Sequence, residues 1–185
     1  DMNVPKEIAS IDALVDAEKD PSAQRAMKKE RELLFLGRLG NLLYDPKQKD
    51  EALARFTALF QSDDAEILWK IFETFKNGSV RQAVNDEPEE TWLRLFHSTR
   101  EENRKIEIIQ HSSKMHQKQQ ELLRAGVKDA SPKVREQSFH NLTALYWKNQ
   151  TKELYDLLWK IADSETEKSA KEAMINSVSG LPQPK

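Results

Sequence analysis

Hydrophobic residues recur along the chain at spacings of three and four positions, which brings side chains onto one face of an α-helix. The spacing is clearest in three stretches near the N-terminus: Ile8, Ile11, Leu14 and Val15; Leu33, Leu36, Leu39, Leu42 and Leu43; and Leu53, Phe56, Leu59 and Phe60. None of these stretches alternates apolar and polar residues as a half-buried strand does. The pattern therefore predicts an all-α protein.

Polar capping residues beside a proline signal helix starts, because the fixed φ of proline suits the first helical turn. Four such pairs occur: Asp20-Pro21, Asp45-Pro46, Glu87-Pro88 and Ser131-Pro132. They predict many short helices. The longer helix predicted over about 21–44 is apolar on nearly every side at 33–36, so we expect it at the centre of the N-terminal half. Gly37 and Gly40 on one face of it indicate either a close helix crossing or two tolerated glycines.

The middle of the chain is less regular. A helix through 67–75 is predicted to stop at Asn77-Gly78, a C-terminal cap signal. A short helix over 80–84, an acidic turn at 86–90 and a helix carrying Trp92 follow, and the turn is the predicted boundary between two halves. A capping box at 98–101 then opens the longest predicted helix, about 99–125, which Gly126 closes.

The last third of the chain repeats itself at the level of residue class. Asp129, Ser131, Pro132, Val134, Arg135, Glu136, Phe139, Leu142 and Leu145 recur 36 positions later as Glu165, Glu167, Lys168, Ala170, Lys171, Glu172, Ile175, Val178 and Leu181. Helices are predicted over 132–148, 151–162 and 165–179, the last with a capping box at 164–167, before a tail at 182–185. Such a period is typical of a solenoid, in which each helix pair buries its apolar face against its neighbours.

The start of the first copy resembles a known repeat family. Lys128-Asp129-Ala130-Ser131-Pro132-Lys133-Val134-Arg135-Glu136 is similar to the beginning of a HEAT repeat, where an acidic-small-Pro turn precedes Val-Arg and an apolar face. The second copy departs from this pattern, with no proline and with Ala170-Lys171 in place of Val-Arg. The resemblance is clearest over 128–181. It implies a right-handed stack of antiparallel helix pairs that binds other macromolecules and has no catalytic residues.

Composition narrows the function further. The chain has 29 basic and 31 acidic residues and a formal charge of −2, so nucleic acid is an unlikely partner. It has no cysteine, which excludes disulfides and thiolate zinc sites. No apolar run approaches the roughly 20 residues that a membrane-spanning helix needs. We expect a soluble protein, cytoplasmic or, if the missing initiator Met reflects signal cleavage, extracytoplasmic.

Catalytic motifs are missing from the sequence. The four histidines, His97, His111, His116 and His140, fit neither the zincin pattern nor the spacing of carboxylate-bridged di-iron bundles. No glycine-rich phosphate loop or nucleophile elbow is present either. We therefore expect no cofactor, no metal and no enzymatic activity.

The apolar stripe of the predicted helix over 99–125 is impure. Met115 belongs to the stripe, but Ser112, His116 and Gln119 occupy its middle by helical geometry. Buried polar groups are costly unless they are paired. Either the stripe is a partner-binding face with Met115 and His116 at its centre, or it is a half-exposed packing edge whose polar residues reach solvent or a neighbouring helix.

Tryptophans offer a second set of candidate binding residues. Trp69 and Trp159 stand in the same tetrapeptide, Leu-Trp-Lys-Ile, at the margin of an apolar helix face. A tryptophan in such a place, like Trp92 on the following helix, can anchor a partner or can cover the edge of the core. Arg135 and its repeat equivalent Lys171 have a structural interpretation, as bridges to Asp129, Asp163 or Glu165.

Together these patterns predict one right-handed α-solenoid of antiparallel helix pairs over 1–181, with nine or ten helices. Its N-terminal half, 1–86, is expected to be less regular than its HEAT-like C-terminal half, 88–181. The predicted function is a protein-binding scaffold with Trp69, Trp92, Met115, His116 and Trp159 as candidate partner-binding residues. The alternatives are a nucleic-acid-binding repeat protein similar to the HEAT-like DNA alkylation-repair glycosylases, and an obligate homo-oligomer with the 99–125 helix as its seam.

Overall fold

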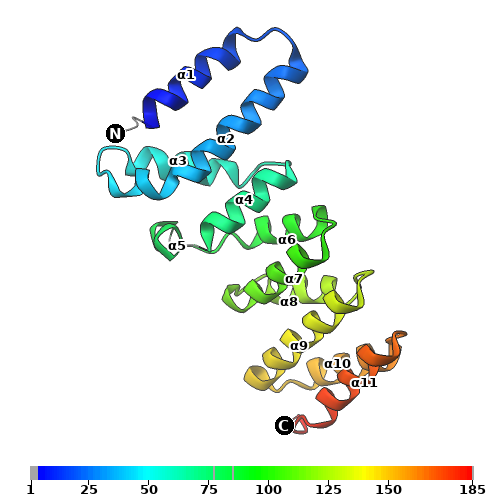
Figure 1. The fold of residues 1–185 in the computed structure, drawn as a ribbon. Helices are drawn as coiled ribbons and strands as arrows, with labels where there is room; N and C mark the ends of the chain where they lie inside the picture. Colours follow the sequence, from blue (N-terminus) through cyan, green and yellow to red (C-terminus); the bar gives the residue numbers. More distant parts are fainter. Residues whose placement is uncertain (1–3, 77, 85, 185) are drawn as a thin grey trace. The chain divides into compact units, whose positions relative to one another are not determined.

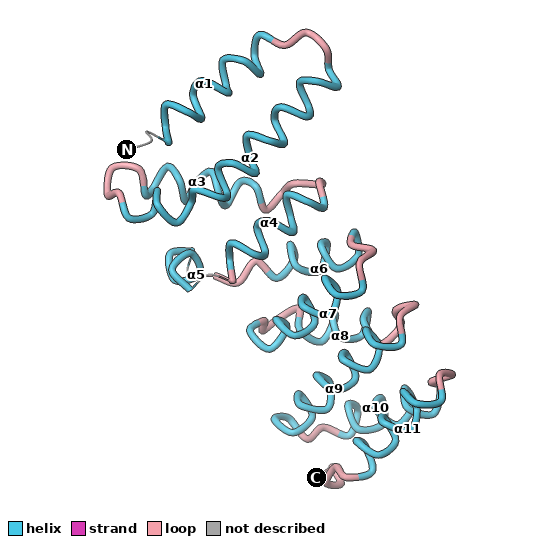
Figure 2. The backbone as a smooth tube through the Cα atoms, in the orientation of Figure 1, coloured by secondary structure: helices cyan, strands magenta, loops and turns pink. Residues whose placement is uncertain are grey.

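The computed structural model describes residues 4–76, 78–84 and 86–184, and within these ranges every regular element is a helix. The described residues form eleven α-helices and one short 3-10 helix, so the predicted all-α class is confirmed and the helix count exceeds nine or ten (Figure 1). Short loops connect the helices (Figure 2). The chain divides into two compact units, Asp1–Thr91 and Trp92–Lys185, and the first unit ends one residue after the predicted boundary at 86–90.

The N-terminal unit is built around its longest helix. Its elements are α1 (Val4–Ala17), α2 (Pro21–Tyr44), α3 (Lys49–Leu59), α4 (Ala65–Phe75), α5 (Gly78–Val84) and the start of α6 (Glu89–Ser98). The helix α2 packs against α1, α3, α4 and α5, which confirms the central position predicted for it. Its start also follows the prediction, because the Asp20 carboxylate accepts hydrogen bonds from the backbone N–H groups of Ser22 and Ala23.

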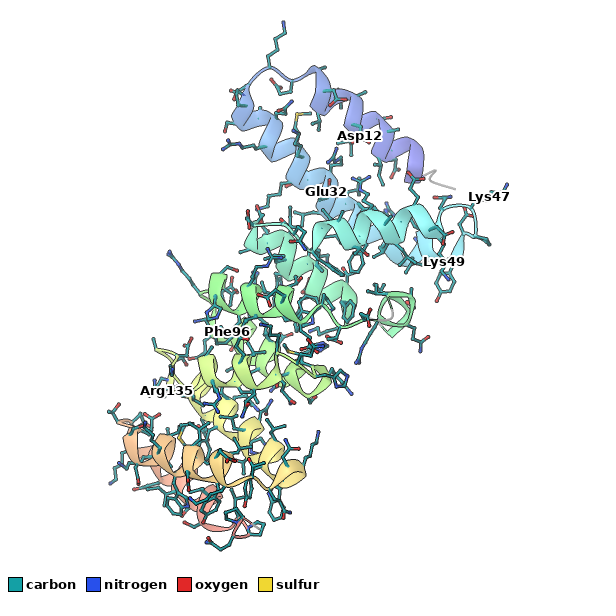
Figure 3. The ribbon with its side chains drawn as sticks, turned by 180° about the vertical axis from the view of Figure 1, so that it is seen from behind. Asp12, Glu32, Lys47, Lys49, Phe96 and Arg135 are labelled. Atoms are coloured by element: carbon teal, nitrogen blue, oxygen red, sulfur yellow. The ribbon has the colours of Figure 1, made fainter. Side chains whose placement is uncertain are left out.

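Ion pairs tie α2 to three of these neighbours. Arg31 bonds Asp12 of α1 at 2.6 Å, and buried Glu32 accepts from Arg55 of α3 at 3.1 Å. Asp12 and Glu32 are labelled in Figure 3. Lys29 reaches Asp64, which caps the start of α4, at 3.3 Å. The charges on this face of α2 are therefore satisfied inside the unit.

Three sequence predictions for this unit remain, one about two glycines and two about helix ends. A Cβ added at Gly37 or Gly40 would meet nothing within 4 Å, so the two glycines are tolerated positions and not a close crossing. Asp45-Pro46 opens a turn, and α3 starts later, at Lys49. The Asn77 cap signal lies outside the described residues.

The C-terminal unit is organised around α9. Its elements are the rest of α6, α7 (Glu102–His111), η1 (Ser112–Lys114), α8 (Gln119–Gly126), α9 (Pro132–Asn149), α10 (Lys152–Ser164) and α11 (Lys168–Ser179). The helix α9 packs against α7 and α11, and also against α8 and α10. The predicted helices over 132–148 and 151–162 are confirmed to within two residues, whereas the predicted helix over 165–179 begins only at Lys168.

The prediction of one long helix over 99–125 is wrong, because the α-helix is interrupted at 112–118. The C-terminus of α7 is held by Asn141 of α9, whose side-chain amide donates to the Ile109 carbonyl at 2.7 Å and to Ser112 Oγ at 3.3 Å. Ser112 is fully buried, and Met115 has an extended backbone. The polar residues that interrupted the apolar stripe thus mark a turn, after which α8 folds back and packs on α7.

Gly126 marks the close helix approach of this unit. A Cβ there would overlap Ser138 Oγ and lie 2.9 Å from both Ser138 Cβ and Ile109 Cδ1. Ser138 lies on α9, is fully buried and donates to the Val134 carbonyl at 2.7 Å. Only a residue without a side chain lets the end of α8 sit this near α9.

Three helices of this unit, α7, α9 and α11, share one arrangement at their starts. Their N-cap residues are Glu101, Ser131 and Glu167, and each is followed four positions later by a cation: Lys105, Arg135 and Lys171. Lys105 pairs with Asp129 in the loop after α8, and Arg135 pairs with Glu165 at the end of α10. Lys171 donates to the Asp163 carbonyl at 2.6 Å. We call this set the cation ladder.

The residues after α11 fold back onto the unit. Tyr146 donates its hydroxyl to the Pro182 carbonyl at 2.6 Å, and Gln183 donates to the Tyr155 hydroxyl at 2.9 Å. Leu181 is buried. The described part of the predicted tail therefore covers the aromatic side chains between α9 and α10, while Lys185 lies outside the described residues.

Candidate functional site

A groove in the C-terminal unit lies where the end of α8, the start of α9 and the end of α10 meet. Its volume is about 410 Å³. Its lining consists of Arg124, Val127, Lys128, Arg135, Leu157, Lys160, Ile161, Ser164, Glu165 and Thr166. We call this hollow the α8–α10 groove, and all of its residues belong to one unit.

An ion pair in the groove lining ties the start of α9 to the connection between α10 and α11. The Arg135 guanidinium donates to both carboxylate oxygens of Glu165 at 2.7 Å, and to the carbonyls of Asp129 and Ala130 at 2.9 Å. Arg135 lies near the start of α9 and is labelled in Figure 3. Such a two-pronged contact fixes both partners, so the guanidinium is fully engaged by the protein.

Glu165 is held as a carboxylate. Only 4% of its side chain is exposed, and it also accepts from the backbone N–H groups of Thr166 and Glu167 at 2.9 Å. The hydrogen bonds from Arg135, helped by these backbone donors, lower the pKa of the Glu165 carboxyl from its ordinary value to about 2. The pair is therefore charged at any physiological pH and acts as a clamp between the α8–α9 and α10–α11 connections.

Three other cations of the groove have no such partner. Arg124, Lys128 and Lys160 are exposed, and none of them forms an ion pair or side-chain hydrogen bond with a described residue. Arg124 and Lys160 stand 36 positions apart, which is the period of the repeat. The structure thus gathers three unpaired positive charges in the lining of one hollow.

Three apolar side chains line the groove together with these cations. Val127, Leu157 and Ile161 line the groove and are half-buried, so each offers part of its surface to an occupant. Burying such surface is favourable, by about 25 cal/mol for each Å² removed from water. The groove therefore combines a positive rim with an aliphatic floor.

Two other hollows do not combine unpaired cations with apolar surface in this way. A smaller one of about 230 Å³ in the N-terminal unit lies between α1, α2 and α3, where Asp12 and Arg55 are already ion-paired. A third, of about 330 Å³ between α7, α9 and α11, is lined by mixed charges, and its Lys133 bonds Glu102 at 3.1 Å. Three unpaired cations beside apolar surface distinguish the α8–α10 groove from these two hollows, whose arginine and lysine side chains are ion-paired.

The candidate residues from the sequence are placed differently. Trp92 and Met115 are buried in the C-terminal unit, at 0% and 2% exposure, and Trp69 is 9% exposed in the N-terminal unit. These three side chains pack in the cores and leave almost no surface for a partner in this conformation. Trp159 is half-buried and contacts Tyr155 with ring centroids 6.5 Å apart.

His116 is exposed in the turn between η1 and α8. It lies outside the lining of the α8–α10 groove, as does Trp159. The structure therefore does not bring the five sequence candidates together at one site. The cations that do share a site, Arg124, Lys128 and Lys160, were not selected from the sequence. The 36-position spacing of Arg124 and Lys160 is the signal that could have pointed to them.

Among the described residues, no three side chains of His, Cys, Asp or Glu are grouped so that they could hold a metal ion. Over the same part of the chain, no helix is both long and apolar enough to cross a bilayer.

Comparisons with protein-family models, curated proteins and solved structures found no match for the chain. The function is therefore inferred from the groove and from the packing of the helices around it.

Proposed function

We propose that the chain is a non-catalytic protein-binding scaffold whose C-terminal unit is a right-handed, HEAT-like α-solenoid. In this proposal α7, α9 and α11 are the first helices of successive repeats, and α8 and α10 are the second helices. The packing of α9 between α7 and α11 supports it, because neighbours in a solenoid stack in chain order. In this proposal the N-terminal unit is the less regular half of the chain.

The cation ladder is the observation that carries the repeat interpretation. An N-cap followed four positions later by a cation occurs at the start of all three proposed first helices. Lys105 and Arg135 each reach forward to an acid beyond the next second helix, at Asp129 and Glu165. A recurring contact of this kind is expected when each repeat is clamped to the next one.

The α8–α10 groove is the feature that makes this scaffold a binding module. Solenoids bind through surfaces to which successive repeats contribute equivalent side chains. Arg124 and Lys160 occupy equivalent positions on the two proposed second helices, and both line the groove. Neither cation forms an ion pair with a described residue, so both are available to a partner.

The rival proposal, a nucleic-acid-processing repeat, has less support. It would need an aromatic ring and a free carboxylate on a broad basic surface. Lys152 pairs with Asp156 at 2.6 Å, and Trp159 packs beside Tyr155. The groove lining contains no aromatic residue on which a base could stack.

Affinity capture with quantitative mass spectrometry tests the scaffold proposal. The tagged chain is incubated with nuclease-treated lysate of the source cell, beside Trp159→Ala and a triple variant with Arg124, Lys128 and Lys160 changed to Glu. We expect at least one protein to be retained by the wild-type chain and lost from one variant, and then to bind as a purified pair in calorimetry. If the chain retains proteins only from lysate that was not treated with nuclease, the proposal would be contradicted.

A further inference from the structure

We propose that the α8–α10 groove binds an acidic segment of a partner protein, with an aliphatic side chain of that segment seated on Val127, Leu157 and Ile161. This inference rests on the proposed scaffold function and names the chemistry of the partner. Its occupant has carboxylates on either side of a Leu, Ile or Val side chain. The carboxylates would pair with Arg124, Lys128 and Lys160.

Charge complementarity carries the first step. The chain as a whole is slightly acidic, with a formal charge of −2, so long-range attraction does not draw an acidic peptide to it. Three exposed cations without described partners nevertheless share this one hollow. Arg124 lies in the last turn of α8, where a cation is favoured, whereas Lys160 lies earlier in α10, outside its last turn. The preference of cations for helix C-termini does not account for the apolar surface that lines the groove with them.

The apolar floor carries the second step. Val127, Leu157 and Ile161 come from the end of α8 and from one face of α10, and each is half-buried. A purely charged ligand would pair with the rim and leave this surface wet. The volume of about 410 Å³ has room for side chains of an inserted segment, so an apolar anchor between acidic residues fits both features.

The same residues argue against other anionic partners. Single-stranded nucleic acid binds through aromatic stacking as well as cations, and the lining holds no aromatic residue. A single phosphate could be held by the free guanidinium fork of Arg124, but it would leave Val127, Leu157 and Ile161 exposed to water. An acidic peptide is the occupant that uses the free cations and the aliphatic floor together.

Peptide selection tests the proposal without knowledge of the partner. A phage-displayed library of random 12-residue peptides is selected on the full chain. The triple variant Arg124→Glu, Lys128→Glu and Lys160→Glu serves as the counter-selection. We expect enriched peptides to carry Asp or Glu around Leu, Ile or Val, and to lose binding to the triple variant. Enrichment only of neutral or basic peptides, or of peptides that the triple variant still binds, would overturn the proposal.

Anisotropy titrations of the most enriched peptide, labelled with fluorescein, then locate the site. We expect Arg124→Glu, Lys128→Glu and Lys160→Glu each to weaken binding at least threefold, and 0.3 M salt to weaken it further. Lys148→Glu is the matched control, because Lys148 is an exposed lysine near the far end of α9 and lies outside the groove lining. An equal loss with Lys148→Glu would overturn the assignment to this groove.

A substitution on the floor separates anchoring from charge. We expect Leu157→Ser to weaken the peptide at least threefold while the salt dependence stays as in the wild-type chain. Thermal unfolding of Leu157→Ser reports whether the fold is kept, and Lys160→Glu gives the charge effect in a chain whose core is untouched. A Leu157→Ser chain that melts as the wild type does and binds the peptide as tightly would overturn the role of the floor.

Two further outcomes distinguish this inference from the proposed function. If a partner protein is captured and its binding is unaffected by all three charge reversals, the groove assignment fails and the scaffold proposal stands. If a 20-nucleotide single-stranded DNA binds the chain and the triple variant loses that binding, both the acidic-peptide inference and the protein-scaffold proposal fail.

Discussion

At the scale of single residues, the most consequential contact is the buried pair of Arg135 and Glu165. Removing one partner of such a pair leaves the other desolvated and unneutralised, which costs more than the pair itself contributes. Glu165 also accepts two backbone hydrogen bonds, from Thr166 and Glu167. The clamp therefore holds the α10–α11 connection as well as the α8–α9 loop.

We predict that Glu165→Gln lowers the free energy of unfolding by about 2 to 3 kcal/mol at pH 7. The pKa of Glu165 is about 2 in the folded chain and has its ordinary value of 4.5 when unfolded, so its stabilisation is complete above pH 4.5 and declines toward pH 2. The difference between wild type and variant should shrink over that window. Urea unfolding from pH 3 to pH 7 measures it, with exposed Glu172→Gln as the control.

A difference between wild type and Glu165→Gln that is as large at pH 3 as at pH 7 would contradict the proposed charge state. If Glu172→Gln also destabilises the chain, the loss of any negative charge in this region would explain the effect of Glu165→Gln, and the ion pair with Arg135 would not be responsible.

Glycine positions give a second test at this scale, because two of them differ sharply in their surroundings. We predict that Gly126→Ala destabilises the chain by roughly 1 to 3 kcal/mol, since the added methyl overlaps Ser138 and Ile109. Gly40→Ala should instead stabilise it by up to about 1 kcal/mol, because its Cβ meets nothing within 4 Å and alanine favours helix. Thermal unfolding of both variants checks the opposite signs, and a stabilised Gly126→Ala would refute the close crossing.

At the scale of elements, the notable feature is the break between α7 and α8. Local periodicity favours one helix across 99–125, yet Asn141 of α9 bonds the Ile109 carbonyl that a continuing helix would use. The two short helices then fold back on each other and pack on α9, and this brings the end of α8 to the groove. The break is therefore part of how the site is made.

We predict that Asn141→Ala lowers the free energy of unfolding by about 1 to 2 kcal/mol, because it removes a hydrogen bond to a half-buried carbonyl. Hydrogen exchange followed by mass spectrometry should show faster exchange at the end of α7 and in η1. Asn149→Ala is the matched control, since Asn149 is exposed at the end of α9. Unchanged exchange at 109–115 in Asn141→Ala would contradict this account of the break.

At the scale of the whole molecule, the chain consists of two compact units, each with its own core. Phe72 is fully buried in the first unit, and Leu142 is fully buried in the second. The two units can therefore be destabilised separately. The single 99–125 helix that the oligomer alternative proposed as its seam is not formed, and the oligomeric state itself stays a prediction.

We predict that Leu142→Ala costs about 2 to 5 kcal/mol and lowers hydrogen-exchange protection within 92–184, while the N-terminal unit keeps its protection. Phe72→Ala should have the reverse pattern. Native-state hydrogen exchange of both variants provides the measurement. Loss of protection in both units from either substitution would indicate that the chain unfolds as one cooperative block.

Much of the helical framework could be predicted from sequence. The helix α2 with its Asp20 cap and Pro21, the helix α9 with its Ser131 cap and Pro132, and the pattern of buried residues within them follow from local rules. The candidate site could not be predicted in the same way. Trp69 is predicted at the margin of an apolar helix face and Trp92 is a further candidate, yet both are buried, and their burial depends on helices that pack on them in the fold.

What the sequence by itself determined is the all-α class and most helix positions, because spacing, caps and prolines act within a few residues of each other. Only the tertiary structure decided where the 99–125 helix breaks, that Gly126 lies against Ser138, and which cations remain unpaired. These outcomes depend on residues far apart in the chain, such as Arg135 and Glu165, whose contact forms only when the helices pack. Pairing and burial belong to that packing, and local periodicity carries no information about them.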